Sequence, residues 1–236
     1  MRNPVRRFQH RTVDAIKRHA LAVSVRSRKA QTQVLQEYLW IEEGAEAIAL
    51  DRIPPEAPWL AKLVTRQLED ETRHAKLLRA RLAELGVAST RPPPSILRVK
   101  LWWLDRVCGP YMDAFAAGRV VVLLAVAAQL ETTGVRMFER HLGVLDELAP
   151  DDPTGEVLRS ILRDERRHMK SCNSAARKLL REHERATYEE LCDKIAAVDR
   201  SFGITISVGF WLNLVSAAVR DRHLVLAAPS LGKAAA

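Results

Sequence analysis

The sequence repeats a short motif in which a glutamate precedes a histidine by three positions. Residues 68–74 read L-E-D-E-T-R-H and residues 162–168 read L-R-D-E-R-R-H, so both follow the pattern L-x-D-E-x-R-H. Two matches that share Leu, Asp and Arg at fixed offsets indicate an internal repeat. Positions i and i+3 lie on one helical face, so each motif presents a carboxylate and an imidazole to one point. The four metal ligands predicted in this way are Glu71, His74, Glu165 and His168.

A dinuclear metal centre in a four-helix bundle takes one further glutamate from each of the other two helices. In the helix predicted over residues 118–145, Glu131 is surrounded at helical spacing by apolar or small residues: Leu124, Ala127, Ala128, Gly134, Val135 and Phe138. An ionised carboxylate left unpaired on such a face costs several kcal/mol, and a cation would offset that cost. We therefore expect Glu131 to be a metal ligand.

The helix predicted over residues 32–53 should supply the last carboxylate, and helical phase selects among its glutamates. Glu42 falls in the middle of the face formed by Leu35, Tyr38, Leu39, Ala45, Ala49 and Ile53. Two antiparallel helices joined by a short turn place equivalent positions equally far from that turn, and the midpoint of Glu42 and Glu71 lies close to Pro55. Glu42 is the predicted ligand, with Glu43, at the edge of the same face, as the alternative.

The predicted set combines four carboxylates with two imidazoles and contains no thiolate, which suits iron, with manganese as the alternative. Asp70 and Asp164 each lie one turn before a histidine, where they could accept the outer N–H of an imidazole and fix its orientation. Arg73 and Arg167 would pair with these aspartates across the bundle. The complete set of predicted metal ligands is Glu42, Glu71, His74, Glu131, Glu165 and His168.

The composition and the positions of Pro and Gly indicate an all-α protein of ordinary soluble type. Hydrophobic residues make up 47% and charged residues 28% of 236 positions, which excludes disorder as the main state. Pro and Gly divide the chain into predicted helices at 11–26, 32–53, 57–85, 118–145 and 155–182, followed by a helical region after Tyr188, with Gly86 as a helix cap and 87–95 as a stiff linker. The expected parts are a basic helical arm over 1–30, a bundle over 31–185 and a helical extension over 186–236.

Charge is uneven along the chain. Residues 1–30 hold nine Lys and Arg against one Asp, so the net charge of +8 resides in this segment. It offers a contact with RNA or with an anionic membrane surface, and a solvated basic helix is the alternative. Residues 202–219 carry no charge and reach the length of a membrane span, but Gly, Ser, Thr and Asn dilute them and favour a buried core helix. Three cysteines without C-x-x-C spacing favour a reducing, cytoplasmic location, with peripheral membrane association as a further expectation.

Residues 32–182 resemble the ferritin-like di-iron carboxylate superfamily. The repeated D-E-x-R-H motif is similar to that of bacterial di-iron monooxygenases, and the P-P-E-A-P segment at 54–58 is similar to tRNA-modifying di-iron hydroxylases. The resemblance implies an antiparallel four-helix bundle in which two iron ions activate O2. The implied activity is oxygenase or hydroxylase chemistry on a small-molecule or acyl substrate, with an external electron donor. The alternative is a ferroxidase, peroxidase or iron-handling protein similar to ferritin and rubrerythrin.

The resemblance leaves two further points open. It is compatible with a homodimer. Tyr38, one turn before Glu42, is expected to be a core aromatic, and a redox or hydrogen-bonding role near the metals is the alternative.

Overall fold

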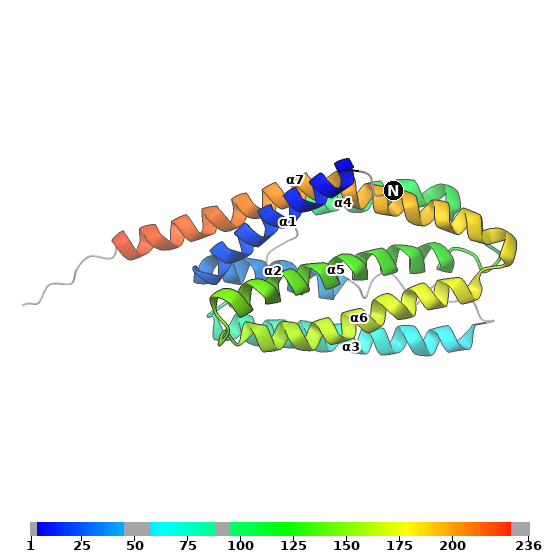
Figure 1. Ribbon diagram of the computed structural model, residues 1–236. Coiled ribbons are helices and arrows are strands. Elements are labelled where there is room, and N and C mark those ends of the chain that lie inside the picture. Colours follow the sequence, from blue (N-terminus) through cyan, green and yellow to red (C-terminus); the bar gives the residue numbers. More distant parts are fainter. Residues whose placement is uncertain (1–3, 45–56, 88–94, 228–236) are drawn as a thin grey trace, which may run out of the picture.

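The protein is built from helices (Figure 1). A computed structural model describes residues 4–44, 57–87 and 95–227, and within these ranges no strand occurs. The predicted all-α class is confirmed. The helices are α1 (Pro4–Val25), α2 (Arg28–Gly44), α3 (Pro58–Glu84), α4 (Ser95–Cys108), α5 (Val120–Leu148), α6 (Thr154–Leu179) and α7 (Arg185–Ala227).

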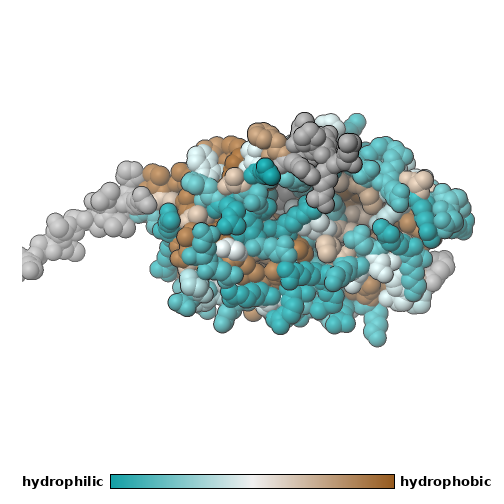
Figure 2. All heavy atoms as spheres, in the orientation of Figure 1, coloured by the Kyte–Doolittle hydropathy of each residue, from teal (hydrophilic) through white to brown (hydrophobic). Residues whose placement is uncertain are grey.

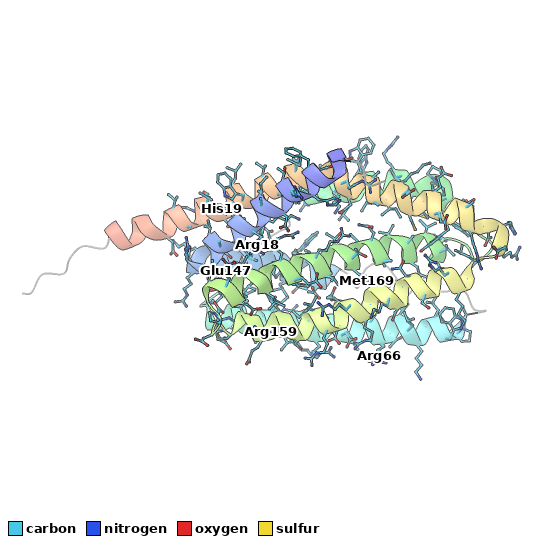
Figure 3. The ribbon with its side chains drawn as sticks, viewed as in Figure 1. Arg18, His19, Arg66, Glu147, Arg159 and Met169 are labelled. Carbon is cyan, nitrogen blue, oxygen red and sulfur yellow. The ribbon has the colours of Figure 1, made fainter. Side chains whose placement is uncertain are left out.

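Helices α2, α3, α5 and α6 form a bundle, and the other three helices cover one side of it. Helix α5 packs against α6, and α3 packs against both α6 and α2. Helices α1, α4 and α7 lie together on the side of α5 that faces away from α3 and α6, as Figure 1 shows. Arg18 of α1 and Glu147 of α5, both labelled in Figure 3, form an ion pair at 3.1 Å that joins the two layers at the surface.

Among the residues that the structure describes, the buried apolar side chains form two separate clusters along the bundle. One cluster includes Leu78 of α3, Phe138 of α5 and Leu158 of α6, and the other includes Leu60 of α3 and Val121 of α5. On α3, α5 and α6, the predicted metal ligands fall between the stretches that belong to one cluster and those that belong to the other. Apolar packing at both ends therefore fixes the helices where the polar side chains meet.

The predicted helices are found, with shifted ends. Helix α1 begins at Pro4, seven residues earlier than expected, and α6 ends at Leu179 instead of residue 182. Residues 45–53 of the predicted second helix and most of the predicted linker lie outside the described residues. Helix α4 was missed, because only Lys100, Leu104 and Cys108 of its described side chains are buried, and so few core positions leave a weak apolar repeat.

The uncharged segment 202–219 belongs to α7, and the expectation that it forms a buried core helix is wrong. Only Ser207, Leu214 and Ala217 in this stretch are buried, and Figure 2 shows hydrophobic side chains exposed along α7. Helix α5 and the region Glu182–Asp221 are long and apolar enough to cross a membrane by length and composition alone.

The basic N-terminal segment is a packed helix. Ala20 and Leu21 of α1 belong to the same apolar cluster as residues of α2 and α5. The Gln9 side-chain amide donates to the carbonyl of Arg200 in α7 at 2.7 Å, and the Trp211 indole donates to His19 Nδ1 at 2.7 Å.

Gly86 ends α3, as the sequence predicts. Its φ of 73° is in the left-handed region, which disfavours residues with a Cβ. The amide of Gly86 donates to the carbonyl of Ala83 at 2.8 Å, and the amide of Val87 donates to that of Leu82 at 2.9 Å. This pair of bonds is a Schellman motif, which satisfies the carbonyls at the end of the helix.

We expect Gly86→Ala to lower the free energy of unfolding by about 1 kcal/mol, because alanine is strained at this φ. The added Cβ would also lie 3.2 Å from a guanidinium nitrogen of Arg28. Chemical denaturation monitored by circular dichroism measures the change. Gly209→Ala is the control, because nothing lies within 4 Å of its Cβ position, and it should be neutral or stabilising. Equal stability of Gly86→Ala and the unchanged protein would contradict the strain argument.

Candidate metal centre

The six predicted ligands come together in the middle of the bundle. Two overlapping groups have ligand atoms within 4.8 Å of one another, and Glu71 and Glu165 belong to both. Glu42 and His74 complete one group, whereas Glu131 and His168 complete the other: the full groups are Glu42, Glu71, His74 and Glu165, and Glu71, Glu131, Glu165 and His168. Two shared carboxylates, with a terminal carboxylate and an imidazole on each side, make an arrangement suited to two neighbouring cations.

Helix α2 contributes Glu42, as helical phase indicates, and not Glu43. The Glu42 carboxylate is buried, and its Oε2 lies 3.0 Å from Nδ1 of His74. Glu43 is partly exposed and pairs with Arg79 at 2.6 Å, outside the cluster. Of the two glutamates that the sequence left open, Glu42 therefore lies in the cluster that could hold a metal ion.

The two shared carboxylates lie between the two imidazoles. Glu71 places Oε1 3.0 Å from Nδ1 of His168 and Oε2 3.5 Å from Nδ1 of His74. Glu165 Oε1 lies 3.4 Å from Nδ1 of His74 and 3.8 Å from Nδ1 of His168. Both imidazoles thus direct Nδ1 toward the carboxylates, and Glu71 offers one oxygen to each side.

The outer nitrogen of each imidazole faces an aspartate from the opposite motif. His74 Nε2 lies 3.2 Å from Oδ2 of Asp164, and His168 Nε2 lies 3.1 Å from Oδ2 of Asp70. The sequence interpretation associated each aspartate with the histidine of its own helix, whereas the structure pairs them between α3 and α6. An N–H at Nε2 that donates to the aspartate leaves the Nδ1 lone pair directed at the cluster.

The two arginines of the motifs complete this network at the surface. Arg73 pairs with Asp70 of its own helix at 2.8 Å and with Asp164 across the bundle. Arg167 likewise pairs with Asp164 at 2.9 Å and with Asp70 across the bundle. Each aspartate therefore accepts from one histidine and two arginines, which orients both imidazoles and closes this side of the cluster.

The electrostatics of the cluster are unfavourable without a cation. Burial, followed by the nearby Glu165 charge, raises the pKa of Glu42 well above its usual range. Burial and the Glu131 charge do the same to the pKa of Glu165, and burial raises the pKa of Glu131 to about 8. Burial also opposes ionisation of Glu71, but the neighbouring imidazoles of His168 and His74 outweigh it and lower the pKa of Glu71. Neighbouring carboxylates of this kind are stabilised by a bound cation.

Two atoms at the centre of the cluster make no hydrogen bond of normal geometry, although carboxylate or imidazole atoms lie 3.0 Å and 3.4 Å from them. Glu165 Oε1 and His168 Nδ1 are buried and are among the five unpartnered polar side-chain atoms found in the described residues. Buried polar atoms are nearly always satisfied. The surrounding atoms are carboxylate oxygens and imidazole nitrogens, which are common metal ligands, so metal ions are partners that fit this chemistry. The cluster could therefore hold metal ions.

The carboxylate side of the cluster opens into a cavity of about 1590 Å³. All four glutamates line this cavity, whereas neither histidine is among the described residues of its wall. The imidazole side is closed by the aspartates and arginines of the two motifs. A molecule in the cavity would therefore approach the cluster from the carboxylate side.

Two residues that support the cluster were not predicted. The Gln67 side-chain amide donates to Oε1 of Glu131 at 2.6 Å, and a Cβ at Gly134 would lie 3.3 Å from Oε2 of Glu165. Gln67 lies one turn before Glu71 on the same face, and this spacing could have identified it. The need for a small residue at 134 depends on the approach of α5 to α6, for which the sequence holds no signal.

Tyr38 is a core aromatic in the structure. Its ring packs edge-on against Phe138, with centroids 5.1 Å apart, and its hydroxyl lies 3.1 Å from Nδ1 of His141. Burial lowers the pKa of His141 to about 4, so this imidazole is neutral at physiological pH. The Tyr38 hydroxyl is thus engaged with a neutral histidine.

Comparisons of the chain with protein-family models, with curated proteins and with solved structures found no match. The helical bundle with its buried cluster of acids and histidines is compatible with a ferritin-like fold. The side-chain geometry is therefore the basis for the functional proposal.

Replacing Glu131 by alanine should abolish binding of a second metal ion, because it removes the terminal carboxylate of one group. The metal content per chain, measured by mass spectrometry after anaerobic loading with Fe(II), checks this. Glu43→Ala is the matched control, since Glu43 pairs with Arg79 outside the cluster and should leave the loading unchanged. Retention of both ions by Glu131→Ala would show that the site is assigned wrongly.

Replacing Asp164 by alanine should weaken metal binding by about 10-fold to 100-fold, because His74 loses the acceptor that orients it. Titration of the metal-free protein with Mn(II), followed by calorimetry, measures the affinity. Asp146→Ala provides the control, since Asp146 forms only an exposed pair with Arg159. Equal affinities of the two variants would indicate that the aspartate does not support the metal ligands.

Proposed function

We propose that this chain is a di-iron carboxylate oxidoreductase of the ferritin-like superfamily that activates O2 to oxygenate or hydroxylate an organic substrate. One observation carries the proposal: two overlapping groups of glutamate and histidine share two carboxylates and open onto a cavity of about 1590 Å³. Such a cavity exceeds the ~300–1,000 Å³ of ordinary ligand pockets. It offers room for an organic molecule beside the metal ligands.

The donor set supports iron, with manganese as the alternative. Four glutamates would balance two divalent cations in charge, and carboxylate oxygens with imidazole nitrogens match the preferences of these metals. The pattern of one glutamate from each of two helices and a Glu-x-x-His from each of the other two is that of di-iron and di-manganese carboxylate proteins.

Bound iron would relay electrons from the external donor to O2 and would supply the Lewis acidity that O2 reduction needs. Asp70 and Asp164 hold the two imidazoles in position, and the mainly apolar wall of the cavity would contact an organic substrate on the carboxylate side. In the overall reaction, one atom of O2 enters a C–H bond of the substrate and the other leaves as water. Two electrons and two protons come from an external donor, such as a reduced flavin protein.

A ferroxidase or iron-storage role makes a different use of the same cluster. Storage requires many iron ions to pass through each chain, whereas an oxygenase retains two. The mainly apolar wall, which includes Leu63, Leu124 and Phe210, supports an organic ligand over a stream of hydrated ions. The stoichiometry of iron oxidation separates the two functions.

We expect protein loaded with Fe(II) to stop oxidising iron after about two ions per chain, with one O2 consumed for two Fe(II). Optical absorption and an oxygen electrode measure these quantities. Cells that produce the protein under ¹⁸O2 should yield a co-purifying small molecule that contains one ¹⁸O atom, detected by mass spectrometry. Glu131→Ala is the control and should yield no labelled product. Continued oxidation and mineralisation of many irons per chain would favour storage and contradict the oxygenase.

A further inference from the structure

The cavity beside the metal cluster has a second, charged end. Helices α1, α4, α5 and α7 contribute Lys17, Lys100, Arg140 and Asp199 to its wall, on the side away from α3 and α6. The metal-binding carboxylates line the same cavity on the bundle side. One continuous space therefore joins a charged end to the cluster, past a mainly apolar wall.

Most of the charged groups at this end are paired with one another. Lys100 forms an ion pair with Asp199, and Arg140 pairs with Asp14 at 2.7 Å. Asp199 also lies 3.5 Å from the hydroxyl of Thr133 on α5. These pairs neutralise two cations and two anions, so they leave no charge for a ligand to compensate.

Lys17 is the exception. Within the described part of the chain its ammonium forms no hydrogen bond or ion pair, although it lines the cavity. Burial and the nearby Arg140 charge lower the pKa of Lys17 to about 8, against the smaller opposing effects of the Asp199 and Asp14 charges, so its ammonium is still mainly charged at pH 7. Lys17 is partly buried, and an anionic ligand in the cavity would give its ammonium the ion pair that it lacks.

The other charged side chains of the wall strengthen this preference. Arg11, Arg136 and Arg200 also line the cavity and add positive charge around it. Glu37 of α2 also lines the cavity and lies outside the metal cluster. Burial raises its pKa to about 7, and it makes no ion pair with Lys17. The α1 side of the cavity therefore carries an excess of cations.

We propose that the substrate is an apolar molecule with a single anionic group, a carboxylate or a phosphate, which Lys17 binds while the apolar body extends to the glutamates of the metal cluster. This inference rests on the proposed function, because the bound ligand is a substrate only if the metal cluster oxidises it. Ligand pockets are mostly apolar and use a few polar groups to fix orientation, and Lys17 has that role here. Leu130 and Met137 of α5 line the same cavity and would contact the apolar body.

Binding of alkyl probes tests the inference. Hexadecanoate and hexadecyl phosphate are titrated into the metal-loaded protein, in parallel with hexadecanol and hexadecylammonium, by displacement of a fluorescent fatty acid. We expect one anionic probe to bind per chain, at least 10-fold more tightly than the alcohol or the amine. The two anionic probes show whether carboxylate or phosphate is preferred. Equal affinities of the anionic and uncharged probes would overturn the proposal.

Variants at Lys17 show whether this residue selects the anion. Lys17→Met should weaken binding of the preferred anionic probe about 10-fold and leave the alcohol unchanged, whereas Lys17→Arg should restore the preference. Arg18→Met is the matched control, because Arg18 pairs with Glu147 at the surface. Thermal unfolding confirms that each variant is folded. Retention of the anionic preference by folded Lys17→Met would overturn the assignment to Lys17.

The same titration on Glu131→Ala and on metal-free protein separates this inference from the proposed function. If the anionic preference persists there while iron loading fails in the unchanged protein, the ligand site stands and the di-iron function is wrong. If iron loading and O2 consumption succeed but the anionic preference is absent, the function stands and the substrate class is wrong.

Discussion

The interaction on which the structure depends is the mutual repulsion of four carboxylates held in one cross-section of a helical bundle. Glu42, Glu131 and Glu165 all have raised pKa values because burial and neighbouring charges oppose their ionisation. Free helices would relieve this repulsion by moving apart. They are held together by two apolar clusters, one on each side of the carboxylates along the bundle. The fold thus preserves an unfavourable site that bound cations would convert into a favourable one.

The network behind the imidazoles gives the site its direction. Asp70 of α3 orients His168 of α6, and Asp164 of α6 orients His74 of α3. Each of these helices therefore depends on the other to position its histidine. The same aspartates bind Arg73 and Arg167, which cover this side with paired charge. On the opposite side the four carboxylates of the cluster line the cavity. The asymmetry between a closed imidazole side and an open carboxylate side determines where a ligand can reach the cluster.

Much of the site could be predicted because each ligand leaves a local trace in the sequence. A repeated motif identifies α3 and α6, a carboxylate on an apolar face identifies Glu131, and helical phase separates Glu42 from Glu43. The crossed aspartates could not be predicted, because their pairing depends on how far α3 and α6 are displaced along each other. Helix α4 and the exposed face of α7 were misjudged for a related reason: apolar composition does not show which face finds a partner.

The basic residues of α1 differ in their surroundings, and this difference follows from the fold and not from the net charge of the segment. The basic residues of α1 contribute to one compositional signal, yet Lys17 and Arg18, adjacent in sequence, face different surroundings. Lys17 lines the internal cavity, whereas Arg18 pairs with Glu147 at the surface. Adjacent positions on a helix differ by about 100°, so a helix that packs beside a cavity sends neighbouring charges to opposite environments. A basic segment therefore need not have a single partner: its outward charges can meet solvent or a surface while an inward charge selects the ligand of the buried site.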